Sequence, residues 1–154
     1  MSDAIILLIY VIFLAFFFAK VEIHIEGENG WAARLPTWRI ENHPLLDFFW
    51  GGRPLTGYHV WAFSFMTLAF HLPIAVSGEI SIRLEARCLG CLMLFWVLED
   101  FLWFVLSPTY TVWQLFRGEV SWHKYMLLGL PRDYWVFAFA GGTCFVLSYI
   151  KKFC

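Results

Sequence analysis

Two adjacent carboxylates, Glu99 and Asp100, lie well inside a long apolar segment that runs from 87 to 107. The segment is long enough to cross a bilayer as one helix. An acidic residue at the centre of a membrane helix costs roughly 2.5 to 3.5 kcal/mol on an insertion scale, so such residues normally face other helices, a partner or water. We therefore predict that one or both carboxylates face the interior of a helical bundle.

Histidines are the second residue type that could take part in chemistry with these acids. Glu99 is about twelve residues from position 87, which corresponds to ~18 Å along a helix and places it between His71 and His59 in height. The other three histidines belong to two long polar segments above the acidic pair. The sequence thus predicts a catalytic pocket of Glu99, Asp100, His59 and His123, with carboxylate and imidazole as acid and base.

The same residue types are ligands of Zn, Fe and Mn. If a transition metal is the cofactor, its ligands are expected among seven residues: His59, Glu99, Asp100, His123, His24, Glu26 and His43. The sequence contains no His-Glu-x-x-His motif, so its spacing does not select among them. In the structural alternative, the histidines are solvated at the membrane surface and the acids are buried against Ser64, Thr67 or an arginine.

Cys88-x-x-Cys91 opens the same apolar segment. A thiol pair at this spacing near a helix start resembles that of small four-helix membrane oxidoreductases that pass electrons between thiols and quinone. That resemblance implies a redox role for Cys88 and Cys91. Those proteins carry a second cysteine pair in a loop, whereas the other two cysteines here are Cys144, inside an apolar segment, and Cys154, the last residue.

The composition is that of a membrane protein. Of the 154 residues, 60% are hydrophobic and only 15% are charged, and the mean hydropathy is +0.66. Soluble domains are nearer 45–50% apolar and 25% charged. With a formal net charge of −1 and no basic cluster, the sequence gives no indication of nucleic acid binding.

Four apolar segments predict an all-α integral membrane protein, a four-helix bundle that forms a single membrane domain over 1–154. The predicted spans are 4–23, 58–77, 87–107 and 134–150. The first lacks the basic start and cleavage site of a signal peptide, so we expect it to be retained. Pro73 is expected to kink the second. On the second span, His59, Ser64, Thr67 and His71 form a polar stripe that is expected to look inward.

Two long amphipathic segments, 24–57 and 108–132, are predicted to lie on one membrane face. They combine tryptophans with arginines and are interrupted by Pro and Gly, as is typical of the headgroup region. Arg53 and His123 are candidates to descend toward the acidic pair. The alternation in 21–27 fits either a strand with Glu22, His24 and Glu26 on one face, or a helix in which Glu22 and Glu26 pair and His24 points elsewhere.

An even number of spans puts both termini on one side of the membrane. Lysines and arginines close to the span ends favour a cytoplasmic location for the termini. Ala138-x-x-x-Gly142 in the fourth span is a small-residue face for close helix approach, in a homo-oligomer or with a membrane-protein partner.

Three functions follow as expectations. The leading one is a membrane-embedded enzyme, with or without a metal, that acts on a lipid or other apolar substrate. The alternatives are a structural or assembly subunit that packs against other membrane helices, and the thiol–quinone oxidoreductase. A transporter or proton path is less favoured, because four short spans show no pair of broken helices.

Overall fold

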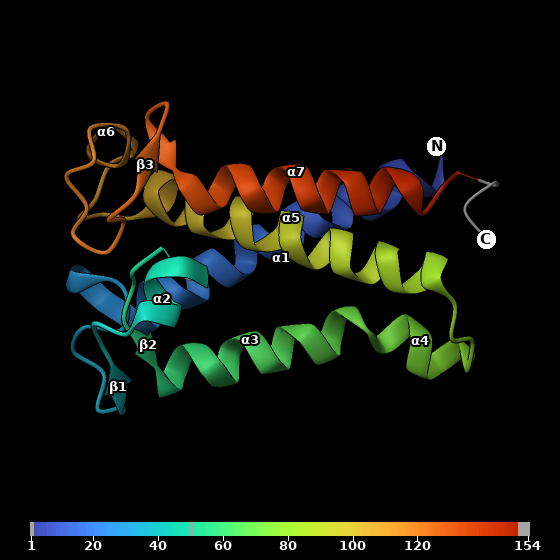
Figure 1. Cartoon of the computed structure of the whole chain (residues 1–154), viewed down its shortest axis with the longest axis horizontal. Helices are drawn as coiled ribbons and strands as arrows, with labels where there is room; N and C mark the ends of the chain where they lie inside the picture. The colour runs from blue at the N-terminus through green and yellow to red at the C-terminus, as the bar shows by residue number, and fades with distance from the viewer. Residues whose placement is uncertain (1, 50, 151–154) are drawn as a thin grey trace.

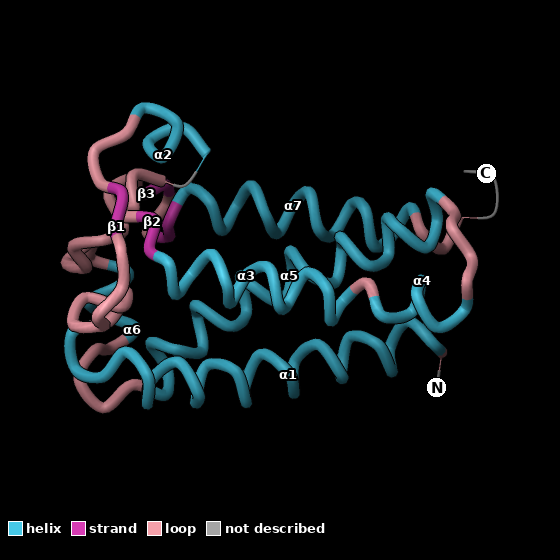
Figure 2. The backbone as a smooth tube through the Cα atoms, turned by 90° about the horizontal axis from the view of Figure 1, so that it is seen from below, coloured by secondary structure: helices cyan, strands magenta, loops and turns pink. Residues whose placement is uncertain are grey.

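The computed structural model describes residues 2–49 and 51–150. The chain is 66% helical. Its long helices run side by side: α1 (Asp3–Glu26), α3 (Gly57–Phe70) with its continuation α4 (Leu72–Ser77), α5 (Ile82–Leu106) and α7 (Arg132–Leu147) (Figures 1 and 2). Within these described residues, three stretches have the length and apolar composition to cross a membrane, namely Asp3–Asn29, Gly57–Ser77 and Ile82–Leu106.

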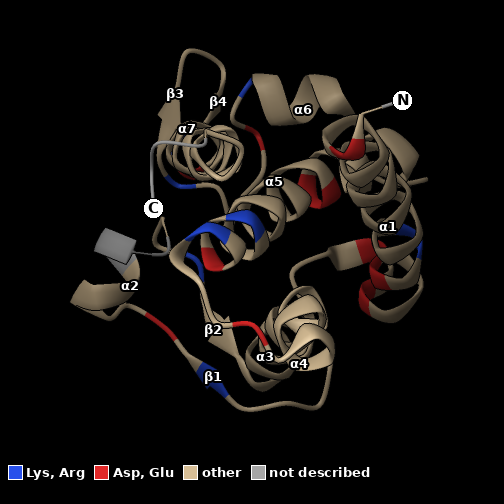
Figure 3. Ribbon diagram, turned by 90° about the vertical axis from the view of Figure 1, so that its right-hand side faces the viewer, with Lys and Arg blue, Asp and Glu red and all other residues tan. Residues whose placement is uncertain are grey.

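Helix α5 is the centre of the fold. It packs extensively against α1 and α7, and more lightly against α3. The helix begins at Ile82, earlier than the predicted 87, because Ser81 caps it by accepting a hydrogen bond from Leu84 N at 3.3 Å. Viewed along the bundle, the helices carry few charged residues (Figure 3).

The alternating segment 21–27 is helical, which settles the alternative left open by its sequence. Helix α1 continues through Lys20 to Glu26 and ends at Gly27, whose φ of +67° suits glycine. Glu22 and Glu26 therefore lie one turn apart on the buried face of α1, while His24 is exposed.

The second predicted span is interrupted at His71, where α3 ends and α4 begins with Pro73 at its start. Proline lacks an N–H donor and disrupts the preceding turn, as expected for this position. Contrary to the expectation from the sequence, the polar stripe does not look inward as a whole. Ser64 and Thr67 are exposed, and the Ser64 hydroxyl donates to the Val60 carbonyl of its own helix at 2.8 Å, so it needs no inward partner.

The connecting segments gather at the end of the bundle opposite to the N-terminus and the α4–α5 link (Figure 1). The first contains the 3₁₀ turn η1 (Gly27–Asn29), α2 (Pro44–Phe49), and strands β1 (Arg39–Ile40) and β2 (Leu55–Thr56), paired antiparallel with Arg39 opposite Thr56. The second contains α6 (Val112–Phe116) and the antiparallel pair β3 (Met126–Leu127) and β4 (Leu130–Pro131). The sequence predicted amphipathic segments here but not these strand pairs.

Two apolar clusters form the core. One lies along the helices around Val11, Ala15 and Phe95, and the other is an aromatic layer under the connecting segments around Trp103, Phe104 and Trp122. Between α5 and α7 the backbones meet at Gly90 and Gly141. The small-residue contact inside the bundle is thus made by Gly141, the neighbour of the predicted Gly142.

Candidate functional site

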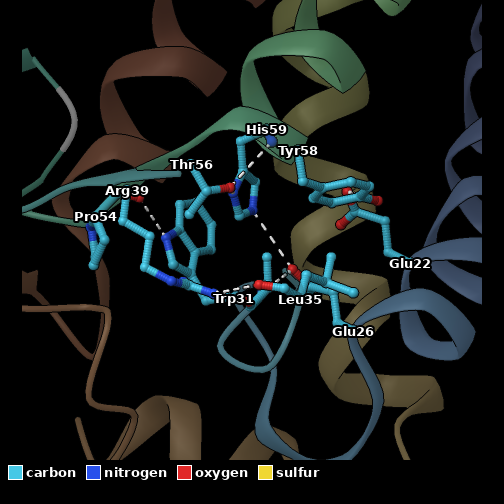
Figure 4. A network of polar contacts seen from close by, with 10 residues as sticks. Glu22, Glu26, Trp31, Leu35, Arg39, Pro54, Thr56, Tyr58 and His59 are labelled. Carbon is cyan, nitrogen blue, oxygen red and sulfur yellow. Dashed lines mark hydrogen bonds and ion pairs between the residues drawn. The ribbon is translucent and has the colours of Figure 1, made fainter. Parts of the chain in front are cut away.

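A histidine at the start of α3 is held by residues from three segments (Figure 4). Thr56 caps α3 by accepting a hydrogen bond from His59 N at 3.3 Å, and its hydroxyl lies 2.7 Å from His59 Nδ1. On the other side, His59 Nε2 is 3.5 Å from Glu26 Oε1. Trp31 stacks on the imidazole with ring centroids 4.1 Å apart. These contacts fix the orientation of a fully buried imidazole.

The loop that carries Trp31 is held by the same carboxylate. Glu26 Oε1 accepts a hydrogen bond from Ala32 N at 2.7 Å, and the Trp31 indole donates to Pro54 O at 2.8 Å. Trp31 and Ala32 have φ values of +46° and +50°, in the left-handed region that non-glycine residues rarely adopt. The strained turn persists because these hydrogen bonds hold both its sides.

Arg53 enters from the first connecting segment and lies at the centre of a second polar group. Its Nη2 is 2.6 Å from Asp133 Oδ2 and 2.8 Å from His123 Nδ1. It is 3.9 Å from Asp100 Oδ2, and its guanidinium carbon lies 4.8 Å from the centre of the Trp31 ring. Only 8% of Arg53 is exposed, so this cation is placed among carboxylates inside the protein.

The guanidinium determines the tautomer of His123. Arginine only donates, so His123 Nδ1 accepts and the ring proton is on Nε2, which is 3.4 Å from Asp100 Oδ2. Burial lowers the pKa of His123, and the positive charge of Arg53 lowers this pKa further, against the opposing effect of Asp100. The same Asp100 oxygen accepts a hydrogen bond from the Tyr134 hydroxyl. Asp100 is therefore a positioned carboxylate.

Glu99 has a different environment, although it is the next residue. Only 2% of it is exposed, and no donor from the described part of the chain reaches its Oε1. The polar group beside it is the carboxyl of Glu22, with which Glu99 shares a side-chain hydrogen bond. Oε1 of Glu22 also accepts a hydrogen bond from the Tyr58 hydroxyl at 3.0 Å. Two buried carboxyl groups thus face each other without a cation from residues 2–49 or 51–150 between them.

A cavity of about 230 Å³ opens beside these groups. At one end it is bounded by polar side chains, among them Glu22, Arg53, His59, Glu99, Asp100, Asp133 and Tyr134. The rest of its wall is apolar and comes from α3, α5 and α7: Phe63, Leu89, Leu92, Met93, Trp96, Val97 and Phe137. From Glu99 to Leu89 this wall follows α5 for ~15 Å. The cavity therefore has two chemically distinct ends.

The structure brings some of the predicted site residues together and separates others. His59, Glu99 and Asp100 line the cavity. His123 does not line the cavity but lies 3.4 Å from Asp100, which does. Glu26 likewise contacts His59 without lining the cavity. His24 and His43 are exposed.

The seven residues proposed as metal ligands are not gathered into one cluster. Among residues 2–49 and 51–150, no three or more His, Cys, Asp or Glu side chains are placed to hold a metal ion. The physical reason is visible at Asp100 and His123, where Arg53 lies within 3.9 Å and 2.8 Å and supplies the positive charge. We assign no step to a metal.

The thiol pair is packed in the bundle. Cys88 and Cys91 are buried free cysteines on α5, and Cys91 belongs to the apolar cluster that contains Phe95. Cys144 is half-buried in α7, and Cys154 lies outside the described residues.

Sequence reasoning missed several residues of the site. Trp31, Asp133 and Tyr134 line the cavity, and Tyr58 binds Glu22. Glu22 carried a signal, because its spacing from Glu26 puts both on one helical face. The sequence also held a signal for Asp133 and Tyr134. They are a polar pair at the start of the fourth apolar segment, and this position lies at the height of the connecting segments.

Fold and site together define a helical protein with a buried, acid-rich cavity next to apolar helices. Comparison with protein-family models, with curated proteins and with solved structures gave no match. The geometry of the site is therefore the basis for a functional assignment.

Proposed function

We propose that the chain is a multi-pass membrane protein with four spans, and that its cavity is the active site of an enzyme acting on an amphipathic substrate. Three spans are the helices with the length to cross a bilayer. The fourth is α7, whose 16 residues rise ~24 Å and lie beside α5. That is shorter than a ~30 Å hydrocarbon core, and flanking residues such as Tyr149 and Ile150 extend it.

The two-ended cavity supports an amphipathic substrate. Sites for whole drug-sized ligands run from about 300 to 1,000 Å³, so a cavity of about 230 Å³ suits a polar head with its first carbons. The apolar wall from Val97 to Leu89 matches a hydrocarbon chain. Helices α3 and α7 both line the cavity, so a chain bound there would extend between them toward the lipid.

Glu99 is the proposed acid–base residue, and its unpartnered Oε1 is the observation that carries the assignment. Asp100 already accepts a hydrogen bond from Tyr134 and lies beside Arg53 and His123. Its proposed role is to balance the charge of Arg53 and to orient the His123 ring. Glu99 has no such donor at Oε1 among the described residues, and with Glu22 beside it the pair can give a proton to a bound substrate or take one.

Comparison of wild-type protein with Glu99→Gln tests this assignment. Each purified protein, in detergent, is incubated with a total lipid extract of its own membranes, and the lipids are compared by mass spectrometry. We expect a species converted by the wild type at a rate at least 100-fold above that of Glu99→Gln, since acid–base catalysis contributes typically 10²–10⁴-fold. Glu28→Gln, at an exposed position, is the matched control. Equal conversion by wild type and Glu99→Gln contradicts the proposal.

A structural or assembly subunit is the second candidate, and one observation favours it. The predicted small-residue face remains uncovered, because Ala138 is exposed and a Cβ added at Gly142 meets nothing within 4 Å. Phe139 on the same helix is 79% exposed. A second copy or a partner helix could pack there. Cross-linking of Ala138→Cys in membranes distinguishes the two assignments, because only a subunit requires this contact.

A further inference from the structure

The charges around the cavity do not balance. Four carboxyl groups line it, those of Glu22, Glu99, Asp100 and Asp133, whereas Arg53 is the single lysine or arginine in the described lining. Burial of a charge is costly unless it is paired. A ligand, a proton or both must therefore compensate the excess.

Arg53 does not compensate Glu22 and Glu99. Its Nη2 contacts Asp133 at 2.6 Å and His123 at 2.8 Å, and its guanidinium face rests on Trp31. The contact of Arg53 with a second acid, Asp100, is already long at 3.9 Å. The carboxyls of Glu22 and Glu99 are hydrogen-bonded to each other, and no second lysine or arginine of the described lining compensates them. The Tyr58 hydroxyl is a neutral donor to Glu22 alone.

We propose that the cavity binds a protonated primary amine on an apolar chain, with the ammonium group at the free Oε1 of Glu99, beside the carboxyl of Glu22. This inference rests on the proposed function and specifies the substrate class of the same site. The unpartnered Oε1 of the fully buried Glu99 marks the position of the ammonium group.

The chemistry of an alkylammonium fits both ends. Its head carries three N–H donors and no acceptor, like the head of lysine, which complements the unpartnered Oε1 of Glu99. The face of an aromatic ring attracts a cation within about 6 Å, and the lining contains Phe63, Trp96 and Phe137. A metal ion fits less well, because three ligands are not assembled in the described residues. The carbon chain would follow α5 past Val97 and Met93.

Three probes of equal chain length test the charge preference. Octylamine, octanol and octanoate are titrated at pH 7 into the full chain in phosphatidylcholine nanodiscs, and binding is followed by tryptophan fluorescence and by the shift in Tm. We expect octylamine to bind at least tenfold more tightly than octanol, and octanoate to bind most weakly. Glu99→Gln and Glu22→Gln should each weaken octylamine binding about tenfold or more and leave octanol binding within threefold. Glu28→Gln should behave as the wild type.

The outcomes separate this inference from the proposed function. Octanol or octanoate binding as tightly as octylamine overturns the ammonium assignment, as does octylamine binding that Glu99→Gln and Glu22→Gln leave unchanged. In those cases the proposal that this cavity is the substrate site is still supported if Leu89→Trp, which fills its apolar end, abolishes binding of the preferred probe. Failure of all three probes to bind the wild type contradicts both proposals. The Tm of each variant without ligand verifies that it is folded.

Discussion

At the residue scale, Arg53 is the side chain on which the charge network depends. It is 8% exposed and within 4 Å of Asp133, His123 and Asp100. Removal of one partner of a buried ion pair leaves the other charge uncompensated, which is more costly than replacement of both.

We therefore expect Arg53→Met to destabilise the protein by about 3–5 kcal/mol. Unfolding in detergent, followed by near-ultraviolet circular dichroism, measures the change in the free energy of unfolding. Arg117→Met is the matched control, because Arg117 has a side chain that is 71% exposed and lies 3.8 Å from Glu119. Its loss should change stability by less than about 1 kcal/mol. Equal effects of the two substitutions would rule out the central role of Arg53.

We expect His123 to make the stability of the protein depend on pH. Its pKa in the folded chain is lowered by burial and by Arg53, whereas in the unfolded chain it is about 6.5. The unfolded chain thus binds the proton first as the pH falls. The contribution of His123 is complete above pH ~6.5 and is lost below it, by at most ~1.4 kcal/mol per pH unit, until the pH reaches the folded pKa.

This dependence is measured as the drop in Tm between pH 8 and pH 5 in detergent. The drop should be smaller in His123→Asn than in the wild type, because the variant has no imidazole to protonate at this position. His43→Asn, at an exposed position, should retain the full drop. A drop in His123→Asn that matches the wild type would show that other groups cause it.

At the element scale, the site depends on where helices begin, end and approach one another. The continuation of α1 to Glu26 places two acids under the loop of Trp31, and the Thr56 cap places His59 at the first turn of α3. The approach of α5 to α7 at Gly90 brings Tyr134 within hydrogen-bonding reach of Asp100.

The two glycines Gly90 and Gly142 provide a matched test of that approach. A Cβ at Gly90 would lie 2.7 Å from Phe145 N and 2.9 Å from Gly141 O, both backbone atoms, whereas a Cβ at Gly142 meets nothing within 4 Å. We expect Gly90→Ala to destabilise by about 1–3 kcal/mol through overpacking. Gly142→Ala should be neutral or stabilise by up to ~1 kcal/mol through helix propensity. Thermal unfolding in detergent measures the stability of both variants. A Gly90→Ala variant as stable as the wild type would refute the close backbone contact.

At the scale of the whole molecule, the polar chemistry is concentrated at one end of the bundle. The connecting segments and the cavity's charged groups lie there, and the N-terminus and the α4–α5 link lie at the other end (Figure 1). A four-span arrangement requires that these two ends lie on opposite sides of the membrane.

Labelling with a membrane-impermeant maleimide tests this requirement. Single cysteines at the exposed positions Glu28, Glu79 and Glu119 are introduced into a chain in which the native cysteines are replaced by alanine. We expect Glu28→Cys and Glu119→Cys to react from one side of the membrane and Glu79→Cys only from the other. Reaction of all three from the same side would exclude the four-span arrangement. The side that labels Glu79→Cys also tests the expected cytoplasmic location of the termini.

The sequence alone determined the helical class and the long apolar helices, because composition and run length are local properties. It also predicted that Glu99 or Asp100, or both, face the interior of the bundle, since a charge inside an apolar helix must find a polar environment. Spacing indicated Glu22 and Glu26 as one face of a helix, but the seven residues between 21 and 27 were too few to exclude a strand.

Only the tertiary structure decided how the polar residues are partnered. Arg53 and His123 are 70 positions apart and come from different connecting segments, and no periodicity relates them. Their contact depends on how those segments fold over α5, which is decided by packing and by hydrogen bonds such as that of Trp31 to Pro54. For the same reason Glu99 and Asp100, adjacent in the chain, differ in role. They point about 100° apart on the helix, so one meets the cation of Arg53 and the other meets a second carboxyl.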